Sequence, residues 1–115
     1  MSIPREELVN PQFIDTAYAK AQETIGKHLF VTDAGTVAGA GEGGFPVQFD
    51  YVAGDDVALI RSGTAKVIAG AAVAANADVE SDADGKAITL NTGKKNGRTI
   101  NSAAQAGDIL YITIP

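Results

Sequence analysis

The chain has 115 residues, a formal net charge of −5 at pH 7, one histidine and no cysteine. This length corresponds to a single domain. The absence of cysteine excludes disulfides, a thiol nucleophile and thiolate-bound metals, and a single histidine excludes a metal site built from several histidines of one chain.

Charge and hydropathy also indicate which partners to expect. Nine Lys and Arg residues are scattered among fourteen Asp and Glu residues, so nucleic acid, which is bound through clustered cationic side chains, is not expected. The sequence has no run of 18 apolar residues, and residues 1–7 lack the basic and then apolar order of a signal peptide. We therefore expect a protein that is made in the cytoplasm and has no membrane partner.

Residues 1–26 are predicted to form an extended N-terminal arm that contains one short helix. Two prolines interrupt its polar first part. Asp15 or Thr16 is suited to cap a helix over residues 17–24, because these are good helix formers and Gly26 follows them as a stop signal.

Residues 27–115 are predicted to form a single β-rich domain, because short runs of alternating apolar and polar residues begin there. In one run, Val47, Phe49 and Tyr51 fall on the same face. Further strands are expected at residues 28–32, 57–60, 65–68, 78–80, 86–90 and 109–114. Many short strands at this spacing predict a mainly β fold, a small β-sandwich or barrel.

The last of these runs is apolar on both of its faces. Leu110, Ile112 and Ile114 lie on one face, and Ile109 and Tyr111 lie on the other. A strand that is apolar on both faces is covered on both. In a protein of this size, we expect another subunit to supply one of the two covers.

Glycine-containing pairs predict the turns. Asp84–Gly85 and Asn96–Gly97 are typical of tight hairpin turns in which both central residues take a positive φ. Gly54–Asp55 and Gly107–Asp108 each precede an apolar strand, so each Asp is expected to accept hydrogen bonds from backbone amides of a tight turn. Residues 69–75 are rich in alanine, but an early glycine favours a turn and an extended stretch over a helix.

Asp78, Glu80, Asp82 and Asp84 form the most site-like cluster of the sequence. Read from Glu80, their spacing resembles a calcium-binding loop. Such a loop begins with Asp, and its twelfth residue, here Asn91, supplies a carboxylate that binds the ion through both oxygens. We therefore favour a solvated hairpin tip, and cation binding stays open as the alternative.

No catalytic residue, metal or cofactor is expected, and the chain is not expected to be an enzyme. His28 has no second histidine, no cysteine and no Gly-x-Ser-x-Gly motif to act with. The glycine-rich residues 39–44 lack the Lys-Ser/Thr pair of a phosphate-binding loop. Lys86 lies in a stretch similar to the hairpin that carries the modified lysine of lipoyl and biotinyl domains, but with two extra residues, so a carrier domain is a weaker alternative.

Five segments, each a turn followed by a strand, carry a resemblance to a known family: residues 54–60, 62–67, 69–75, 79–87 and 102–110. In the order and spacing of these segments, the sequence resembles the capsid cement (head decoration) proteins of tailed phages and prophages. The resemblance implies a structural virion protein that binds the outer surface of a phage capsid and stabilises the shell.

The resemblance also implies partners and a contact region. The partners are the major capsid protein and further copies of the same chain in a homotrimer, on the outer capsid surface of the virion, after synthesis in the host cytoplasm. Related proteins often engage the capsid through an N-terminal arm. The candidate capsid contacts in this chain are Ser2, Ile3, Pro4, Arg5, Leu8, Val9 and Phe13.

The alternative function is that of a β-rich binding module, such as a phage fibre or a carbohydrate-binding domain. Sugar-binding platforms stack their ligands on aromatic rings. The chain has three tyrosines and no tryptophan, so the carbohydrate interpretation is the less favoured of the two.

Overall fold

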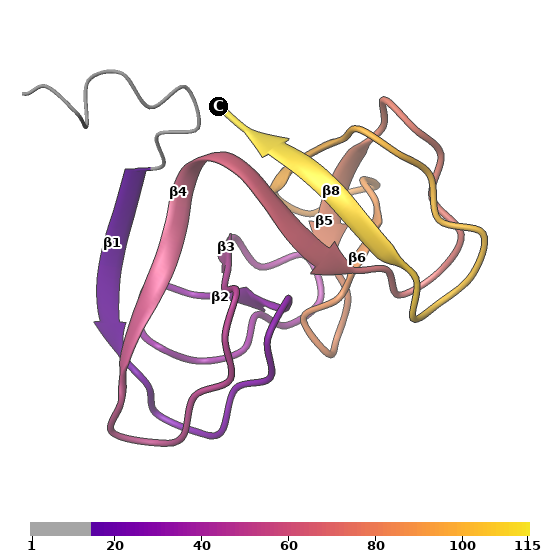
Figure 1. The fold of residues 1–115 in the computed structure, drawn as a ribbon. Helices are drawn as coiled ribbons and strands as arrows, with labels where there is room; N and C mark the ends of the chain where they lie inside the picture. Colours follow the sequence, from indigo (N-terminus) through magenta and orange to yellow (C-terminus); the bar gives the residue numbers. More distant parts are fainter. Residues whose placement is uncertain (1–14) are drawn as a thin grey trace, which may run out of the picture.

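The computed structural model describes residues 15–115, which form the predicted mainly β fold and contain no helix (Figure 1). None of these residues belongs to a helix long and apolar enough to cross a membrane. The strands are β1 (Asp15–Lys20), β2 (Phe30–Val31), β3 (Phe45–Pro46), β4 (Asp56–Ile68), β5 (Asp78–Ser81), β6 (Ala87–Thr89), β7 (Gly97–Thr99) and β8 (Ile109–Ile114).

Six of the strands form one sheet in the order β1-β4-β8-β7-β5-β6, in which every pairing is antiparallel, and β2 pairs with β3 separately. The long strand β4 has two partners. Its first half pairs with β1 as far as Ser62, and its second half pairs with β8 from Gly63 onward. Gly63 has a φ of 109°, a conformation that favours glycine, and Figure 1 shows β4 bending between its two halves.

The sheet curls back toward β4 at its far end. Ala69, directly after β4, forms a parallel bridge with Ala87 of β6, and Gly70 N donates a hydrogen bond to the Ala87 carbonyl at 2.8 Å. The second half of β4 and the strands from β8 to β6 therefore enclose a core that the chain closes on itself.

Two hydrophobic cores lie on either side of the bend in β4. The core near β1 consists of Ala21, Ile25, Val31, Val47, Val57 and Leu59. The core inside the curled sheet consists of Phe30, Ala38, Ile60, Ala65, Val67, Ala69, Val73, Val79, Ala87, Ala103, Leu110, Ile112 and Ile114. Because β4 supplies side chains to both, one strand joins the two halves of the fold.

The predicted helix over residues 17–24 is wrong, because this part of the chain forms β1 and a loop. All six residues of β1 pair with β4. Alanine favours a helix by only a few tenths of a kcal/mol over most residues, and tertiary pairing readily overrides such a preference. The rest of the predicted arm, residues 1–14, lies outside the described residues.

The strand predicted at residues 47–51 is also wrong. β3 ends at Pro46, and the polar side chains that follow bind backbone groups of other segments. Gln48 forms hydrogen bonds with the backbone of Lys66, and Asp50 Oδ1 accepts one from Lys27 N at 2.8 Å. Phe49 is consequently 68% exposed. The two strands expected at 57–60 and 65–68 form one strand, β4.

The two predicted hairpin turns differ from expectation. At the tip between β5 and β6, only Gly85 has a positive φ, of 79°. Asp82 N donates to the Lys86 carbonyl at 2.8 Å and Gly85 N to the Asp82 carbonyl at 3.2 Å, a three-residue loop that ends in a glycine. Asn96–Gly97 forms no turn, because Asn96 is buried and Gly97 begins β7.

The predicted Gly-Asp turns are confirmed. Gly54 and Gly107 each have a φ of 95°. Asp55 accepts a hydrogen bond from Val52 N at 2.9 Å, and Asp108 accepts one from Ala104 N at 3.0 Å. Each turn leads directly into a strand, β4 or β8. Residues 69–75 form a bend and isolated bridges, in agreement with the predicted extended stretch.

Candidate functional site

Two acidic side chains of the hairpin, Glu80 and Asp82, accept hydrogen bonds from backbone amides of the same chain. Glu80 is 6% exposed, and its carboxylate accepts hydrogen bonds from Asn91 N at 3.1 Å and Gly93 N at 2.6 Å. Asp82 Oδ1 accepts from the backbone amides of Asp84 and Lys86 at 2.8 and 2.9 Å. Each carboxylate fixes the loop that donates to it, because hydrogen bonds from backbone amides to a carboxylate are stronger than those to a neutral acceptor.

The remaining carboxylate of the cluster lies among cations. Asp78 Oδ1 lies 3.4 Å from Lys95 Nζ and 3.3 Å from Arg98 NH1. Across residues 15–115, no group of three or more His, Asp or Glu side chains is arranged to hold a metal ion. The segment forms the predicted hairpin, but the expectation that its acidic side chains are solvated is wrong for Glu80, which is buried, and for Asp82, which is half-buried.

His28 and the glycine-rich loop also have structural contacts. His28 has a φ of 69°, and its backbone joins two segments, because its N donates to the Val47 carbonyl at 2.7 Å and its carbonyl accepts from Ile68 N at 2.9 Å. Burial, and then the charges of Lys27 and Lys66, lower the pKa of the imidazole. Ser81 Oγ donates to backbone carbonyls at both ends of the segment 39–42, at 2.7 and 3.0 Å.

Lys86, the candidate for a modified lysine, follows Gly85 at the base of the hairpin tip and is half-buried. A lysine that carries a swinging group needs an exposed place at the tip. The position of Lys86 therefore gives the carrier-domain interpretation no support.

An apolar surface on the sheet is the best candidate for an interaction site. The predicted alternation of β8 is confirmed: Leu110, Ile112 and Ile114 are buried, whereas Ile109 and Tyr111 are 39% and 38% exposed. We expected both faces of β8 to be covered. Among residues 15–115, the face that carries Ile109 and Tyr111 is only partly covered, and the second subunit that we expect there stays a prediction.

Neighbouring strands extend this apolar surface. Ile68 of β4 lies directly opposite Ile109. Ile100, which is 52% exposed, follows β7, and its N donates to the Tyr111 carbonyl at 2.8 Å. Lys66 Nζ lies 5.7 Å from the centre of the Tyr111 ring, within range of a cation–π contact. We call the surface formed by Ile68, Ile100, Ile109 and Tyr111 the outer patch.

The outer patch was only partly evident in the sequence. Ile109 and Tyr111 follow from the alternation of β8, but Ile100 stands alone in a polar segment and no strand was predicted there. The only sequence feature that points to Ile100 is that it is a single β-branched apolar residue directly after Arg98 and Thr99. The candidate capsid contacts Ser2, Ile3, Pro4, Arg5, Leu8, Val9 and Phe13 lie outside the described residues.

Comparison with known proteins shows a likeness in fold. No protein-family model and no curated protein matches the sequence. The fold is similar to that of the head fiber gp8.5 N base in bacteriophage phi29, with a TM-score of 0.68 and 19% sequence identity. The similarity covers 89% of this chain and 94% of that chain, so the two share one fold over almost their whole lengths.

Proposed function

We propose that this protein is a structural component of a phage virion, which binds the outer surface of the capsid and stabilises the shell. The observation that carries the proposal is the fold shared with the base of a phage head fiber. The resemblance of the segments between residues 53 and 115 to capsid cement proteins points to the same part of a virion and rests on the sequence alone.

The outer patch supports a role in assembly. Exposed apolar residues that lie singly on a surface need no explanation, but contiguous ones often mark a contact with another protein. Ile109, Tyr111 and Ile100 come from adjacent parts of one sheet. We assign this surface to the contact between copies of the chain in a homotrimer.

In the same proposal, the N-terminal arm contacts the major capsid protein. Its contact residues are Ser2, Ile3, Pro4, Arg5, Leu8, Val9 and Phe13. A trimer presents three arms together, and the binding of one arm raises the effective concentration of the others. Weak individual contacts then give full occupancy of many equivalent capsid sites.

The base of a head fiber is the second candidate function, favoured by the same shared fold. The two candidates differ in what the bound protein does. A cement protein raises the resistance of the shell to disruption, whereas a fibre base anchors a further structure without that effect. Neither role requires catalysis. Among residues 15–115, His28 and the acidic hairpin side chains contact the fold itself.

Co-sedimentation with shells of the phage that encodes the protein tests the proposal. We expect saturable binding to mature, expanded shells that lack the protein, and a higher temperature of shell disruption when it is bound. A deletion of residues 1–13 is expected to abolish binding and leave the fold intact. Asp84→Ala, an exposed change in the acidic hairpin, is the matched control.

The other results distinguish the candidates. Saturable binding without any gain in shell stability would contradict the cement role and favour the fibre base. No binding to either mature or precursor shells would contradict both. Retained binding after the deletion would remove the arm from the mechanism, and a monomer by sedimentation equilibrium would contradict the homotrimer.

A further inference from the structure

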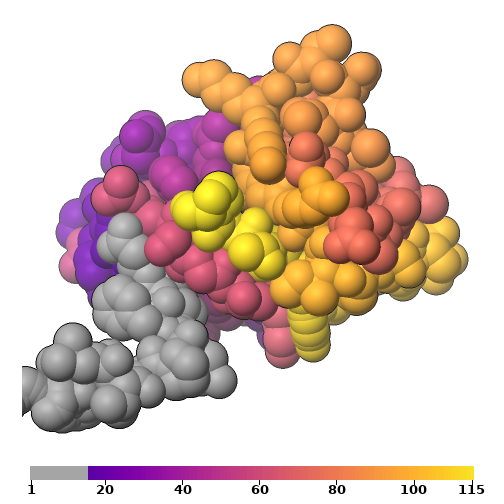
Figure 2. Space-filling model, turned by 90° about the horizontal axis from the view of Figure 1, so that it is seen from above, coloured from indigo at the N-terminus to yellow at the C-terminus, as the bar shows by residue number. Residues whose placement is uncertain are grey.

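β1 is an edge strand of the six-stranded sheet. The strand order gives it a single partner, β4. Figure 1 shows β1 at the margin of the fold with β4 on one side only, and Figure 2 shows the indigo residues of this segment beside the pink residues of β4. The opposite end of the sheet differs, because Gly70 N donates to the Ala87 carbonyl of β6. Within residues 15–115, β1 is therefore the strand at which the sheet can be extended.

The hydrogen bonds of the two residues after β1 show which way the backbone groups of this segment point. Ala21 N donates to the carbonyl of Asp55, the residue before β4, at 2.8 Å. Gln22 N donates to the carbonyl of Gly35, in the loop between β2 and β3, at 2.9 Å. Backbone groups of successive residues in an antiparallel strand point to opposite sides. Odd-numbered residues of β1 therefore bond to β4, and even-numbered residues point away from it.

The contacts of Ala58 agree with this alternation. Ala58 of β4 lies opposite Tyr18, and its N donates to the Tyr51 hydroxyl at 3.2 Å instead of to β1. Tyr18 and Ala58 therefore form a non-hydrogen-bonded pair, whose N–H and C=O groups point away from each other. Thr16, two residues earlier, points the same way as Tyr18, and within residues 15–115 no other segment bonds to the outward groups of either residue. We call the outward N–H and C=O groups of Thr16 and Tyr18 the open edge.

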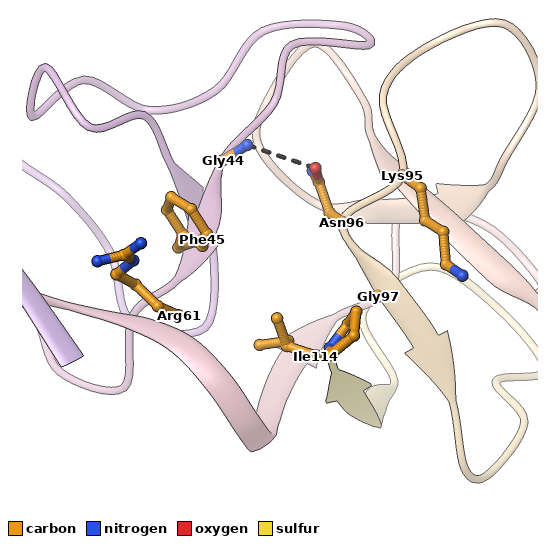
Figure 3. Close-up of a pocket in the computed structure, with 8 residues that line it drawn as sticks. Gly44, Phe45, Arg61, Lys95, Asn96, Gly97 and Ile114 are labelled. Carbon is orange, nitrogen blue, oxygen red and sulfur yellow. Dashed lines mark hydrogen bonds between the residues drawn. The ribbon is translucent and has the colours of Figure 1, made fainter. Parts of the chain in front are cut away.

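A cavity of about 300 Å³ borders β1 on the face of the sheet that Ala17 occupies. Its lining residues are Ala17, Asp33, Phe45, Leu59 and Arg61. Ala17 lies directly opposite Leu59, and Figure 3 shows Phe45 of β3 and Arg61 of β4. Ala17, Phe45 and Leu59 give the cavity an apolar wall, which suits an apolar side chain.

A strand that pairs with the open edge would bring a side chain to this cavity. Ala17 bonds to β4, so the residue opposite Ala17 on the added strand forms a non-hydrogen-bonded pair with it, the type of pair in which the side chains are closer. Side chains paired in this way lie on the same face, with Cβ atoms about 4.5–5.5 Å apart. The cavity that Ala17 lines is therefore within reach of a longer side chain at that position.

The β1 strand of a second copy is poorly suited to this position. Only even-numbered residues present their backbone groups on the open side, so self-pairing sets Tyr18 against Thr16, Tyr18 or Lys20 of the other copy. In each of these registers, Ala17 faces another alanine. An alanine side chain is too short to fill the cavity, so the cavity favours a strand from a different protein with a larger apolar residue.

We infer that the open edge binds an extended segment of another protein as an additional strand, with a Leu, Ile or Met side chain in the cavity beside Ala17. The added strand runs antiparallel to β1, like every other pairing in this sheet. Backbone hydrogen bonds supply the affinity of such a contact, and the cavity selects the side chain. This inference stands on the open edge and the cavity, and does not depend on capsid binding or on the outer patch.

The test is a titration of the full chain followed by NMR of its backbone amides. The probe is the peptide acetyl-Lys-Thr-Thr-Leu-Thr-Thr-Lys-amide, whose central Leu is the residue expected opposite Ala17. We expect saturable shifts and slower hydrogen exchange at the Thr16 and Tyr18 amides, with a dissociation constant on the order of 1 mM. The amides of Ile109 and Tyr111 should not shift, which excludes non-specific binding to the outer patch.

Three altered peptides separate the backbone contact from the side-chain contact. In the paired strand, the Thr residues on either side of the Leu donate to β1, whereas the Leu N–H points away. N-methylation of the Thr after the Leu should therefore weaken binding at least about tenfold, the loss expected for one essential hydrogen bond. N-methylation of the Leu itself is the matched control and should have little effect. Replacement of the Leu by Ala should weaken binding several-fold, because the cavity is left unfilled.

Two variants at one position of the protein provide a second route. Tyr18→Pro removes the outward N–H and leaves the pairing with β4, since proline is tolerated in an edge strand where the N–H faces solvent. It should weaken probe binding at least about tenfold. Tyr18→Thr keeps the N–H and should bind within about threefold of the wild type, because the Tyr18 side chain is 73% exposed. The altered peptides give the same test without a change in the protein if the proline disturbs β1.

Four results would overturn the inference. The first is the absence of shifts at Thr16 and Tyr18 up to about 20 mM probe, a concentration well above the expected dissociation constant. The second is equal binding of the two N-methylated peptides, and the third is equal binding of the Leu and Ala peptides. The fourth is slow exchange of the Tyr18 amide without probe that is lost on dilution or on deletion of residues 1–13, which would assign the open edge to a copy of this chain or to its own N-terminal segment.

Discussion

The side chain of Gln48 forms with the backbone of Lys66 the pair of hydrogen bonds that a neighbouring strand would form. Gln48 Oε1 accepts from Lys66 N at 3.1 Å, and Gln48 Nε2 donates to the Lys66 carbonyl at 3.0 Å. Two residues on, the His28 carbonyl accepts from Ile68 N at 2.9 Å. The edge of β4 that faces away from β8 is thereby closed to pairing with other chains, as an exposed strand edge requires.

Gln48→Ala should lower the free energy of unfolding by about 1–2 kcal/mol, because it removes two hydrogen bonds that each contribute about 1 kcal/mol. Urea denaturation measures the change. Gln105→Ala is the control, since Gln105 is exposed and its side chain makes no hydrogen bond to residues 15–115. Equal stabilities of the two variants would contradict the strand-like role of Gln48.

Leu110→Ala and Tyr111→Ala compare the two faces of β8 at adjacent positions. Leu110 is fully buried in the core of the curled sheet, so its loss should cost about 2–5 kcal/mol. Tyr111 belongs to the outer patch, and its loss should cost about 1 kcal/mol or less in the isolated chain. Urea denaturation at low protein concentration checks both values, and a loss in Tyr111→Ala as large as that in Leu110→Ala would contradict the placement of the Tyr111 ring on the surface.

Glu80→Ala should lower the free energy of unfolding by about 3–6 kcal/mol, the sum for two hydrogen bonds to a charged group. The variant leaves the amides of Asn91 and Gly93 without their acceptor, and hydrogen bonds to a charged group contribute about 1.5–3 kcal/mol each. Asp84→Ala, in the same hairpin, is the matched control, because Asp84 is exposed. Thermal unfolding of both variants checks the difference, and a small effect at Glu80 would show that water replaces its carboxylate.

Stability should decrease as the pH falls below about 6.5, the pKa of histidine in an unfolded chain. Burial and two nearby lysines lower the pKa of His28 in the folded protein, so between the two pKa values the unfolded state binds more protons and protonation favours unfolding. His28→Asn keeps a residue that tolerates the positive φ. The melting temperature should fall between pH 7.5 and 5.5 by more in the wild type than in this variant.

The sequence predicts the parts of the fold that local pattern determines. Alternation indicates the two faces of β8, and Gly-Asp pairs predict the turns before β4 and β8, because glycine accepts their positive φ and aspartate binds the free amides. The helix expected at residues 17–24 fails because the partner of this segment, residues 56–62, lies about 40 residues further along the chain. Local propensity contains no information about such a partner.

The placement of individual side chains likewise depends on contacts with distant segments that the local sequence pattern does not contain. Phe49 has the right spacing for a strand, but Gln48 and Asp50 each bind backbone groups of distant segments, so Phe49 turns to the solvent. Asn96 resembles a turn residue in the sequence. Its burial depends on Gly44 and Val79, and neither contact can be seen in the local pattern.

β4 supplies Val57 and Leu59 to one hydrophobic core and Ala65 and Val67 to the other. Neither half can therefore unfold alone, since removal of β4 from one core also removes its side chains from the other core. A load applied to either half passes through a single continuous strand whose two ladders, with β1 and with β8, resist it together. The molecule thus meets mechanical tension as one body, a property that the proposed role on the outside of a shell would use.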